Sequence, residues 1–347
     1  MEVFTMADKV LVTGGTGFLG MQMLLQLLNK GYDVRTTVRS LKSKDKVINT
    51  LRKNGVTNFE QLSFIEADLS KDDNWTEAMV DRDYVLSVAS PVFFEIPKDE
   101  AEVIRPAVEG ILRILKTASR TKVKRVVMTS NFGAVGFTNQ DWHSVTTEKD
   151  WTDENAKGLS AYEKSKLLAE KAAWRFIETE GKGLEFATIN PVAIFGPSLD
   201  SHVSGSFDLL KGVASGSMKV IPNIQLNVVD VRDVVDLHIR AMSTPEAAGQ
   251  RFIASTDGMI SMPEIAELLR RERPQLAATL SKRVMPNWML KTASYVNATA
   301  KEGQFMAEIN RNVSNAKARE ILGWKPIGTK EEAVLAAVDS LIEYNLI

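Results

Sequence analysis

Residues 10–20 read Val-Leu-Val-Thr-Gly-Gly-Thr-Gly-Phe-Leu-Gly, and this stretch decides the fold that we expect. The apolar run from Lys9 to Val12 predicts a strand, and the apolar spacing from Phe18 to Lys30 predicts a helix. The turn between them must adopt positive φ and must let backbone N–H groups close on a pyrophosphate at the positive end of the helix. Three glycines meet these needs: Gly14, Gly17 and Gly20.

A second strand, predicted over Asp33 to Val38, completes a strand-helix-strand unit after this turn. A glycine-rich turn can also end a strand for structural reasons alone. Here the turn follows a strand, opens an amphipathic helix and reaches a second strand within the length of one unit. This context favours dinucleotide binding over a plain structural turn.

The composition indicates a globular protein with little net charge. Of the 347 residues, 44% are hydrophobic and 25% are charged, and the formal net charge is −1. We therefore expect neither a nucleic-acid partner nor a membrane partner. The absence of cysteine excludes disulfides and thiolate metal sites, and the histidines lack ligand spacing, so we expect no metal site.

The location of the protein is predicted from two further features of the chain. The N-terminal residues lack the apolar region of a secretory signal, and no apolar stretch approaches the roughly 20 residues of a membrane span. We expect a cytoplasmic protein. The sequence predicts no particular oligomeric state.

Strand and helix patterns alternate up to Asn190, which predicts an α/β fold with a Rossmann-type, doubly wound parallel sheet. Beyond Gly196-Pro197 the alternation weakens, which predicts a smaller, mostly helical C-terminal substrate region at the carboxyl edge of the sheet. We assign residues 1–195 and 218–254 to the dinucleotide-binding domain and residues 196–217 and 255–347 to the substrate-binding region. Helices in the later part of the chain are expected at 206–214, 231–242, 262–270, 315–322 and 330–344.

Tyr162 is the one tyrosine with a lysine four residues later, Lys166. On a helix this spacing places both side chains on one face. A nearby ammonium and the positive charge of an oxidised nicotinamide both favour the phenolate, so we expect a tyrosine that can act as acid or base. The alternative is an amphipathic helix with an ordinary tyrosine and lysine.

Ser130 follows the predicted strand Arg125 to Thr129, at the sheet edge where the glycine turn also opens. A hydroxyl at this place can hydrogen-bond a substrate carbonyl oxygen and stabilise the charge that develops there. Alternatively, the serine satisfies the backbone of a loop.

Taken together, these motifs resemble the extended short-chain dehydrogenase/reductases. The similarity is greatest to the branch of dihydroflavonol reductases, cinnamoyl-CoA reductases and microbial NADPH-dependent aldehyde and ketone reductases, and it covers nearly the whole chain. It rests on 13–20, Ser130, Tyr162-Glu-Lys-Ser-Lys166, Asp68-Leu69, Asn190-Pro191, Val229-Asp-Val-Arg-Asp233 and Leu322-Gly-Trp-Lys-Pro326.

The resemblance implies a role for each of these residues. Tyr162 would donate the proton to the carbonyl oxygen, Lys166 would lower its pKa and bind the nicotinamide ribose, and Ser130 would polarise the carbonyl. Asp68 would hydrogen-bond the adenine, although it could instead cap the helix predicted after it. The implied dinucleotide contacts are Gly14, Thr16, Gly17, Phe18, Leu19, Asp68, Leu69, Ala89, Tyr162, Lys166, Pro191 and Val192.

The end of the second strand predicts the choice of dinucleotide. NAD-specific sites carry an acidic residue there, whereas a 2′-phosphate needs a cation, and here Val38-Arg39 occupies this place. By the resemblance, Lys46 matches a phosphate-contacting lysine. We therefore expect NADP(H) as the cofactor.

One departure of the chain from the family pattern bears on the assignment of Ser130. Ser130 is followed by Asn131, where close relatives commonly carry a second serine. The expected reaction is hydride transfer to the carbonyl of a small aldehyde or ketone. The alternatives are a sugar-nucleotide epimerase or dehydratase and a non-catalytic NADP(H)-binding sensor, which would need none of Ser130, Tyr162 and Lys166. Pocket candidates include Ser90 to Phe94, Phe132, and Ile194 to Asp208.

Overall fold

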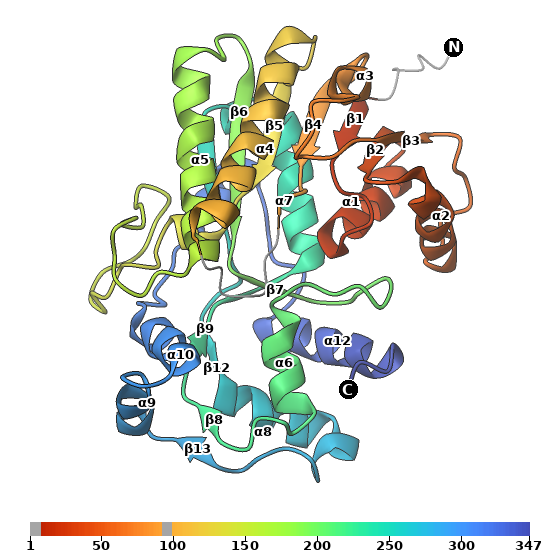
Figure 1. Cartoon of the computed structure of the whole chain (residues 1–347). Helices are drawn as coiled ribbons and strands as arrows, with labels where there is room; N and C mark the ends of the chain where they lie inside the picture. Colours follow the sequence, from red (N-terminus) through yellow and green to blue (C-terminus); the bar gives the residue numbers. More distant parts are fainter. Residues whose placement is uncertain (1–7, 92–98) are drawn as a thin grey trace.

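A seven-stranded parallel sheet forms the centre of the upper part of the molecule (Figure 1). The computed structural model describes residues 8–91 and 99–347. The strand order is β11-β6-β5-β4-β1-β2-β3, as expected for a doubly wound sheet. The strands are β1 (Lys9–Val12), β2 (Asp33–Val38), β3 (Leu62–Glu66), β4 (Tyr84–Ser87), β5 (Arg125–Thr129), β6 (Glu185–Pro191) and β11 (Gln250–Ala254).

Helices cover both faces of this sheet, which confirms the predicted fold class. Alternate residues of β1 supply the two cores: Val10 and Val12 face one side and Leu11 the other, all fully buried. One face carries α1 (Phe18–Asn29), α2 (Lys44–Lys53) and α7 (Val231–Ser243), and the other carries α3 (Trp75–Met79), α4 (Ala101–Arg120) and α5 (Ala161–Thr179).

The strand order reverses at β1, and this reversal places the ligand site. β1 pairs with β2 on one side, through Val12 and Thr36, and with β4 on the other, through Val12 and Leu86. In open α/β sheets a crevice forms beyond the carboxyl ends of the strands at such a point. The turn at 13–17 therefore opens into a crevice.

The C-terminal elements form a second, smaller lobe below the sheet (Figure 1). Its helices are α6 (Phe207–Ala214), α8 (Met262–Glu272), α9 (Asn287–Ala293), α10 (Ala298–Glu308) and α12 (Lys330–Glu343), whereas α11 (Ala316–Leu322) packs against β11 and α7. Three short strand pairs join them: β7 (Ala193–Phe195) with β10 (Val228–Asp230), β9 (Gln225–Leu226) with β12 (Ile260–Ser261), and β8 (Ile221–Pro222) with β13 (Val284–Met285). The five later helices expected from the sequence are present, whereas α9, α10 and these strand pairs were not predicted.

Local sequence explains where two of the predicted helices begin. Ser261 with Glu264 and Thr329 with Glu332 each form a capping box, in which two orphan N–H groups are satisfied reciprocally. The Trp324 of the predicted Leu-Gly-Trp motif is fully buried and its Nε1 donates to Asp233 Oδ1 at 3.2 Å. This contact ties the C-terminal segment to α7. Over the described part of the chain, no helix is long and apolar enough to cross a membrane.

Candidate active site

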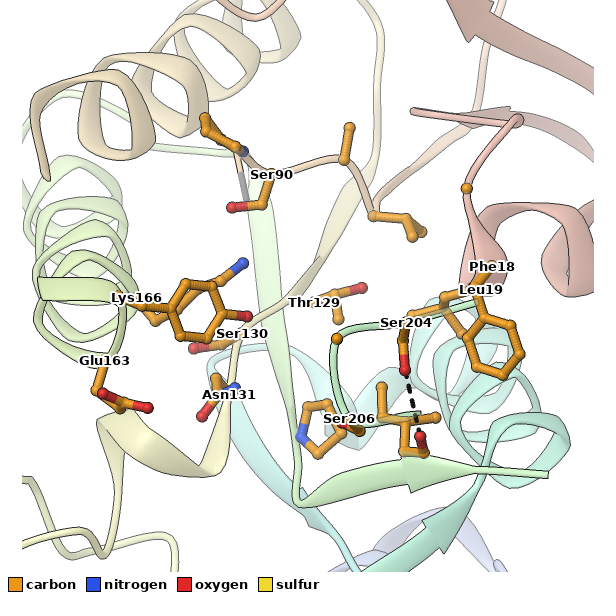
Figure 2. A pocket seen from close by; sticks show the side chains of 18 of the residues that line it. Phe18, Leu19, Ser90, Thr129, Ser130, Asn131, Glu163, Lys166, Ser204 and Ser206 are labelled. Atoms are coloured by element: carbon orange, nitrogen blue, oxygen red, sulfur yellow. Dashed lines mark hydrogen bonds between the residues drawn. The ribbon is translucent and has the colours of Figure 1, made fainter. Parts of the chain in front are cut away.

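A cavity of about 1440 Å³ lies between the carboxyl ends of the strands and the smaller lobe. Every residue that the sequence predicted for catalysis or dinucleotide binding lines this one cavity, with the exception of Lys46. In Figure 2, Lys166, Ser130 and Asn131 lie on one side of it and Phe18, Leu19 and Ser204 on the other. Of the pocket candidates, Val92 to Phe94 lie outside the described residues.

The glycine turn packs too closely for side chains at three positions. Gly14 has φ +73°, and a Cβ there would lie 2.9 Å from the Cβ of Ala89. A Cβ on Gly20 would meet the carbonyl oxygen of Gly14, and one on Gly15 would meet Oγ1 of Thr36. The need for a glycine at position 15 was not predicted from the sequence, because it arises from the packing of β2 against the turn.

Gly17 differs from the other glycines because space is left beside it. A Cβ on Gly17 would come within 3.4 Å of the Gly14 oxygen and of no other atom outside its chain neighbours. Gly17 is also the N-cap of α1, and no side chain caps this helix. Backbone N–H groups at a helix N-terminus without a side-chain cap are donors for an anion. The turn therefore fits a pyrophosphate.

Asp68 and Arg39 both line the cavity, as do residues of the glycine turn. Asp68 accepts hydrogen bonds from the Ser70 backbone N–H (2.8 Å) and hydroxyl (2.7 Å), and these bonds, with a smaller effect of Arg39, lower the pKa of Asp68. Asn74 is the N-cap of α3, so the alternative role of Asp68 as the cap of that helix is wrong.

The two cations predicted for a 2′-phosphate occupy different surroundings. Arg39 is exposed at the cavity, and no ion pair between it and another described residue is formed. Lys46 forms an ion pair with Asp200 at 3.1 Å and does not line the cavity. A phosphate contact of Lys46 stays a prediction.

Tyr162 and Lys166 share one face of α5, as the spacing predicted. The Ser160 hydroxyl accepts the backbone N–H of Glu163 at 3.3 Å, so the helix begins just before Tyr162. Lys166 Nζ lies 5.6 Å from the centroid of the Tyr162 ring, and Lys166 is 7% exposed. Both side chains thus meet at the cavity wall.

Burial shifts the pKa values of both members of this pair. Burial and, to a smaller extent, the neighbouring Glu163 raise the pKa of Tyr162 to about 12, against an opposing effect of hydrogen bonding by the Asn131 side chain. Burial also lowers the pKa of Lys166 to about 8. The lowering that we expect for Tyr162 beside Lys166 and an oxidised nicotinamide stays a prediction.

The Ser130 hydroxyl forms a hydrogen bond within the protein. Ser130 is 3% exposed, and its Oγ donates to Oε2 of Glu170. The fully buried Glu170 carboxylate also accepts from Asn190 Nδ2 at 2.7 Å and from Arg251 Nε at 2.7 Å. The Ser130 hydroxyl proton is therefore engaged in a hydrogen bond to Glu170. This network was not predicted from the sequence, because Glu170 and Arg251 are 81 positions apart.

Asn131 takes the position beside Tyr162. Its Oδ1 accepts the backbone N–H of Gly133, which turns its NH₂ group away from that contact. The Asn131 side chain lines the cavity together with Tyr162 and acts to lower the pKa of that phenol. An amide donor therefore stands where the phenol meets the cavity.

The far end of the cavity is formed by the smaller lobe. His202, Ser204 and Ser206 line it from the loop before α6, and Arg311 lines it from the segment after α10. Burial raises the pKa of the neighbouring Glu163 to about 7. Within residues 8–91 and 99–347, no group of three or more metal-ligating side chains occurs.

Comparison with known proteins gives one family and several reductases. A model of the NAD dependent epimerase/dehydratase family matches residues 10–254. An anthocyanidin reductase of Vitis vinifera is 33% identical over 279 residues, 76% of this chain and 80% of that protein. The crystal structure of Gre2 in complex with NADPH from Candida albicans has a TM-score of 0.79 and 26% identity, and covers 97% of this chain and 99% of the other. Yeast methylglyoxal/isovaleraldehyde reductase Gre2 complexed with NADPH has a TM-score of 0.78 and 26% identity, with the same coverage.

Proposed function

The chain belongs to the NAD dependent epimerase/dehydratase family, and from this premise we propose that it reduces the carbonyl group of a small aldehyde or ketone with Tyr162 as proton donor. It is an oxidoreductase and its cofactor is NADP(H). The observation that carries the proposal is the single cavity lined by the glycine turn, Tyr162 and Lys166.

The residues at one end of the cavity fit the dinucleotide. The turn at Gly17 and the uncapped N-terminus of α1 would hold the pyrophosphate, and Arg39 would bind the 2′-phosphate. Asp68 and Leu69 would lie against the adenine, and Pro191 and Val192 against the nicotinamide. When bound, NADPH supplies the hydride for the reduction.

Tyr162 suits the role of an acid in this reduction. With a pKa of about 12 the phenol keeps its proton at neutral pH, so it can donate to the carbonyl oxygen as negative charge develops there. The Lys166 ammonium then stabilises the phenolate that remains. The pKa of about 8 for Lys166 leaves it mostly protonated at pH 7.

We assign the hydrogen bond to the carbonyl oxygen to Asn131 rather than to Ser130. The Ser130 hydroxyl already donates to Glu170, whereas the Asn131 amide faces Tyr162 and the cavity. A donor aimed at the oxygen lowers the barrier because its interaction strengthens as charge develops. Ser130 then serves to orient the strand end through Glu170.

Substitutions at the two neighbouring positions distinguish these roles. Asn131→Ala is expected to lower kcat/KM by about 100-fold, the usual cost of one such donor. Asn131→Ser keeps a donor and should recover most of the rate. Ser130→Ala should lower the denaturation midpoint while kcat/KM stays near that of the unaltered protein. A larger loss of kcat/KM in Ser130→Ala than in Asn131→Ala would return the role to Ser130.

The proposed reaction is tested by loss of NADPH absorbance with aldehydes, α-dicarbonyls and ketones. Turnover is expected with NADPH, and Arg39→Ala should raise KM for NADPH by about 10- to 100-fold, the value of charge-assisted hydrogen bonds to a phosphate, and leave KM for NADH nearly unchanged. Lys42→Ala, on the same exposed segment but outside the cavity, is the matched control. Tight NADPH binding without turnover of any carbonyl would indicate a sensor instead.

A further inference from the structure

Arg311 is a buried cation in the wall of the active-site cavity, and no described residue forms an ion pair with it. It is 4% exposed and lines the cavity, and its Nε has no hydrogen-bond partner among the described residues. Its Nη2 donates to the Met306 carbonyl oxygen at 3.3 Å, and the guanidinium lies 5.8 Å from the centroid of the Phe137 ring. Burial lowers its pKa to about 10, so it stays charged at neutral pH.

The Arg311 segment is held in place by its backbone rather than by an ion pair. Asn227 Nδ2 donates to the Arg311 carbonyl oxygen at 3.0 Å, and the fully buried Asn310 donates to the carbonyl oxygens of Asp141 and Ser144 at 2.7 and 3.0 Å. The Asn227 Oδ1 atom, on the same cavity wall, is also buried without a partner among the described residues. A pre-positioned guanidinium with an unused donor is suited to an acceptor that arrives from the cavity.

Arg311 lies at the substrate end of the cavity. Its neighbour Phe137 packs edge-on against Phe132 with ring centroids 5.9 Å apart, and Phe132 directly follows Asn131. α10, which leads into Arg311, places Phe305 against Gly158, close to the start of α5. The dinucleotide end, marked by Arg39 and Asp68, is formed by different strands.

We propose that Arg311 binds a carboxylate on the carbonyl substrate, so that the preferred substrates are oxo acids rather than neutral aldehydes or ketones. A buried cation that no described carboxylate pairs has lost its hydration without a compensating ion pair. An anionic group of the ligand would supply that ion pair. Other charged groups of this end are Lys301, Glu302 and Glu163. The first two are exposed, and Glu163 is about half protonated at neutral pH, so none of them replaces the buried guanidinium. This inference rests on the proposed reductase function.

Selectivity of the unaltered protein is the first test. We would compare oxo acids of increasing length, from 2-oxobutanoate to 4-formylbenzoate, each with its methyl ester, and glyceraldehyde 3-phosphate with glyceraldehyde. At least one acid is expected to exceed its ester in kcat/KM by about 10-fold or more, as for a site that hydrogen-bonds its substrate. Because an ester activates the aldehyde more than a carboxylate does, this preference would arise from binding. Preference for the phosphate alone, or for every ester, would overturn the carboxylate assignment.

Arg311→Met keeps the apolar stem and removes the charge. It is expected to lower kcat/KM for the preferred acid by about 100-fold, as for loss of one partner of a buried charge pair, and to leave that for the ester nearly unchanged. Arg271→Met, at an exposed arginine paired with Glu272, is the matched control and should change neither. Equal losses with acid and ester would overturn the inference. If Arg311→Met does not fold, Arg311→Lys and the selectivity of the unaltered protein decide.

Equilibrium binding separates this inference from the proposed reaction. 4-(Hydroxymethyl)benzoate, the alcohol expected from 4-formylbenzoate, is titrated into the protein saturated with NADP, and its Kd is compared with that of the methyl ester. Binding that is lost in Arg311→Met, without turnover of any carbonyl, would support the carboxylate site and contradict the reductase. Turnover of neutral carbonyls, with no Arg311-dependent binding of acids, would support the reductase and contradict the carboxylate site.

Discussion

Tyr162→Phe is expected to lower kcat for carbonyl reduction by about 10³-fold, within the range supplied by a general acid. The substitution keeps the ring and removes only the hydroxyl that donates the proton. Water is a poor replacement because it would not be held, as the half-buried phenol is, at a fixed place beside Lys166. Stopped-flow measurement of NADPH oxidation gives the rate, and fluorescence titration gives the Kd of NADPH, which should change little.

Tyr84→Phe is the matched control for this prediction. Tyr84 opens β4 at the amino end of the sheet, does not line the cavity, and stacks with Lys124 at 5.7 Å. Its turnover should equal that of the unaltered protein. Unchanged turnover in Tyr162→Phe would remove the proton-donor assignment, and parallel losses of turnover and NADPH affinity would indicate a structural role.

Glu170→Gln is expected to destabilise the fold by about 3–5 kcal/mol, the usual cost of removing one partner of a buried ion pair. The Glu170 carboxylate is fully buried, and the change leaves the Arg251 guanidinium, 8% exposed, without its carboxylate. The new amide also brings an NH₂ group to a site whose neighbours are donors: Ser130, Trp174, Thr188, Asn190 and Arg251. Urea unfolding followed by far-UV circular dichroism measures the change.

Two control variants show whether the loss of stability comes from the buried ion pair. Glu267→Gln removes an ion pair with Arg270 whose glutamate side chain is 74% exposed, and should change the free energy of unfolding by less than about 1 kcal/mol. The double variant Glu170→Leu with Arg251→Met removes both buried charges and should recover part of the loss. A midpoint for Glu170→Gln equal to that of the unaltered protein would contradict the role of this ion pair.

The Glu170 network is also the reason why we assign different roles to the adjacent residues Ser130 and Asn131. Glu170 lies two turns after Tyr162 on α5, and its partners come from the end of β5, from β6 and from β11. Arg251 continues the network into the loop before α5, where it donates to the carbonyl oxygens of Glu148 and Asp150 at 2.9 and 2.8 Å. The network therefore takes the donated hydrogen bond of the Ser130 hydroxyl, whereas the Asn131 side chain lines the cavity.

Elements with strong local signals were predicted correctly. The periodicity of the first helix and the apolar runs of the strands placed α1, β2, β5 and β6 within a residue or two of their bounds. The position of the glycines between β1 and α1, and the four-residue step from Tyr162 to Lys166, are properties of adjacent residues. Short segments such as β8 and β13 were missed because two residues carry no periodicity, and their pairing depends on contacts between distant parts of the chain.

The sequence by itself determined the doubly wound sheet, the dinucleotide turn and the residues that gather at its edge, because each depends on patterns that repeat within one or two helical turns. Only the tertiary structure decided how these groups are used. The orientation of the Ser130 hydroxyl, the rise in the Tyr162 pKa and the lack of a counter-ion for Arg311 among the described residues all follow from burial and from partners far away in the chain. Desolvation and hydrogen-bond competition act between residues that folding brings together, so they leave no trace in local spacing.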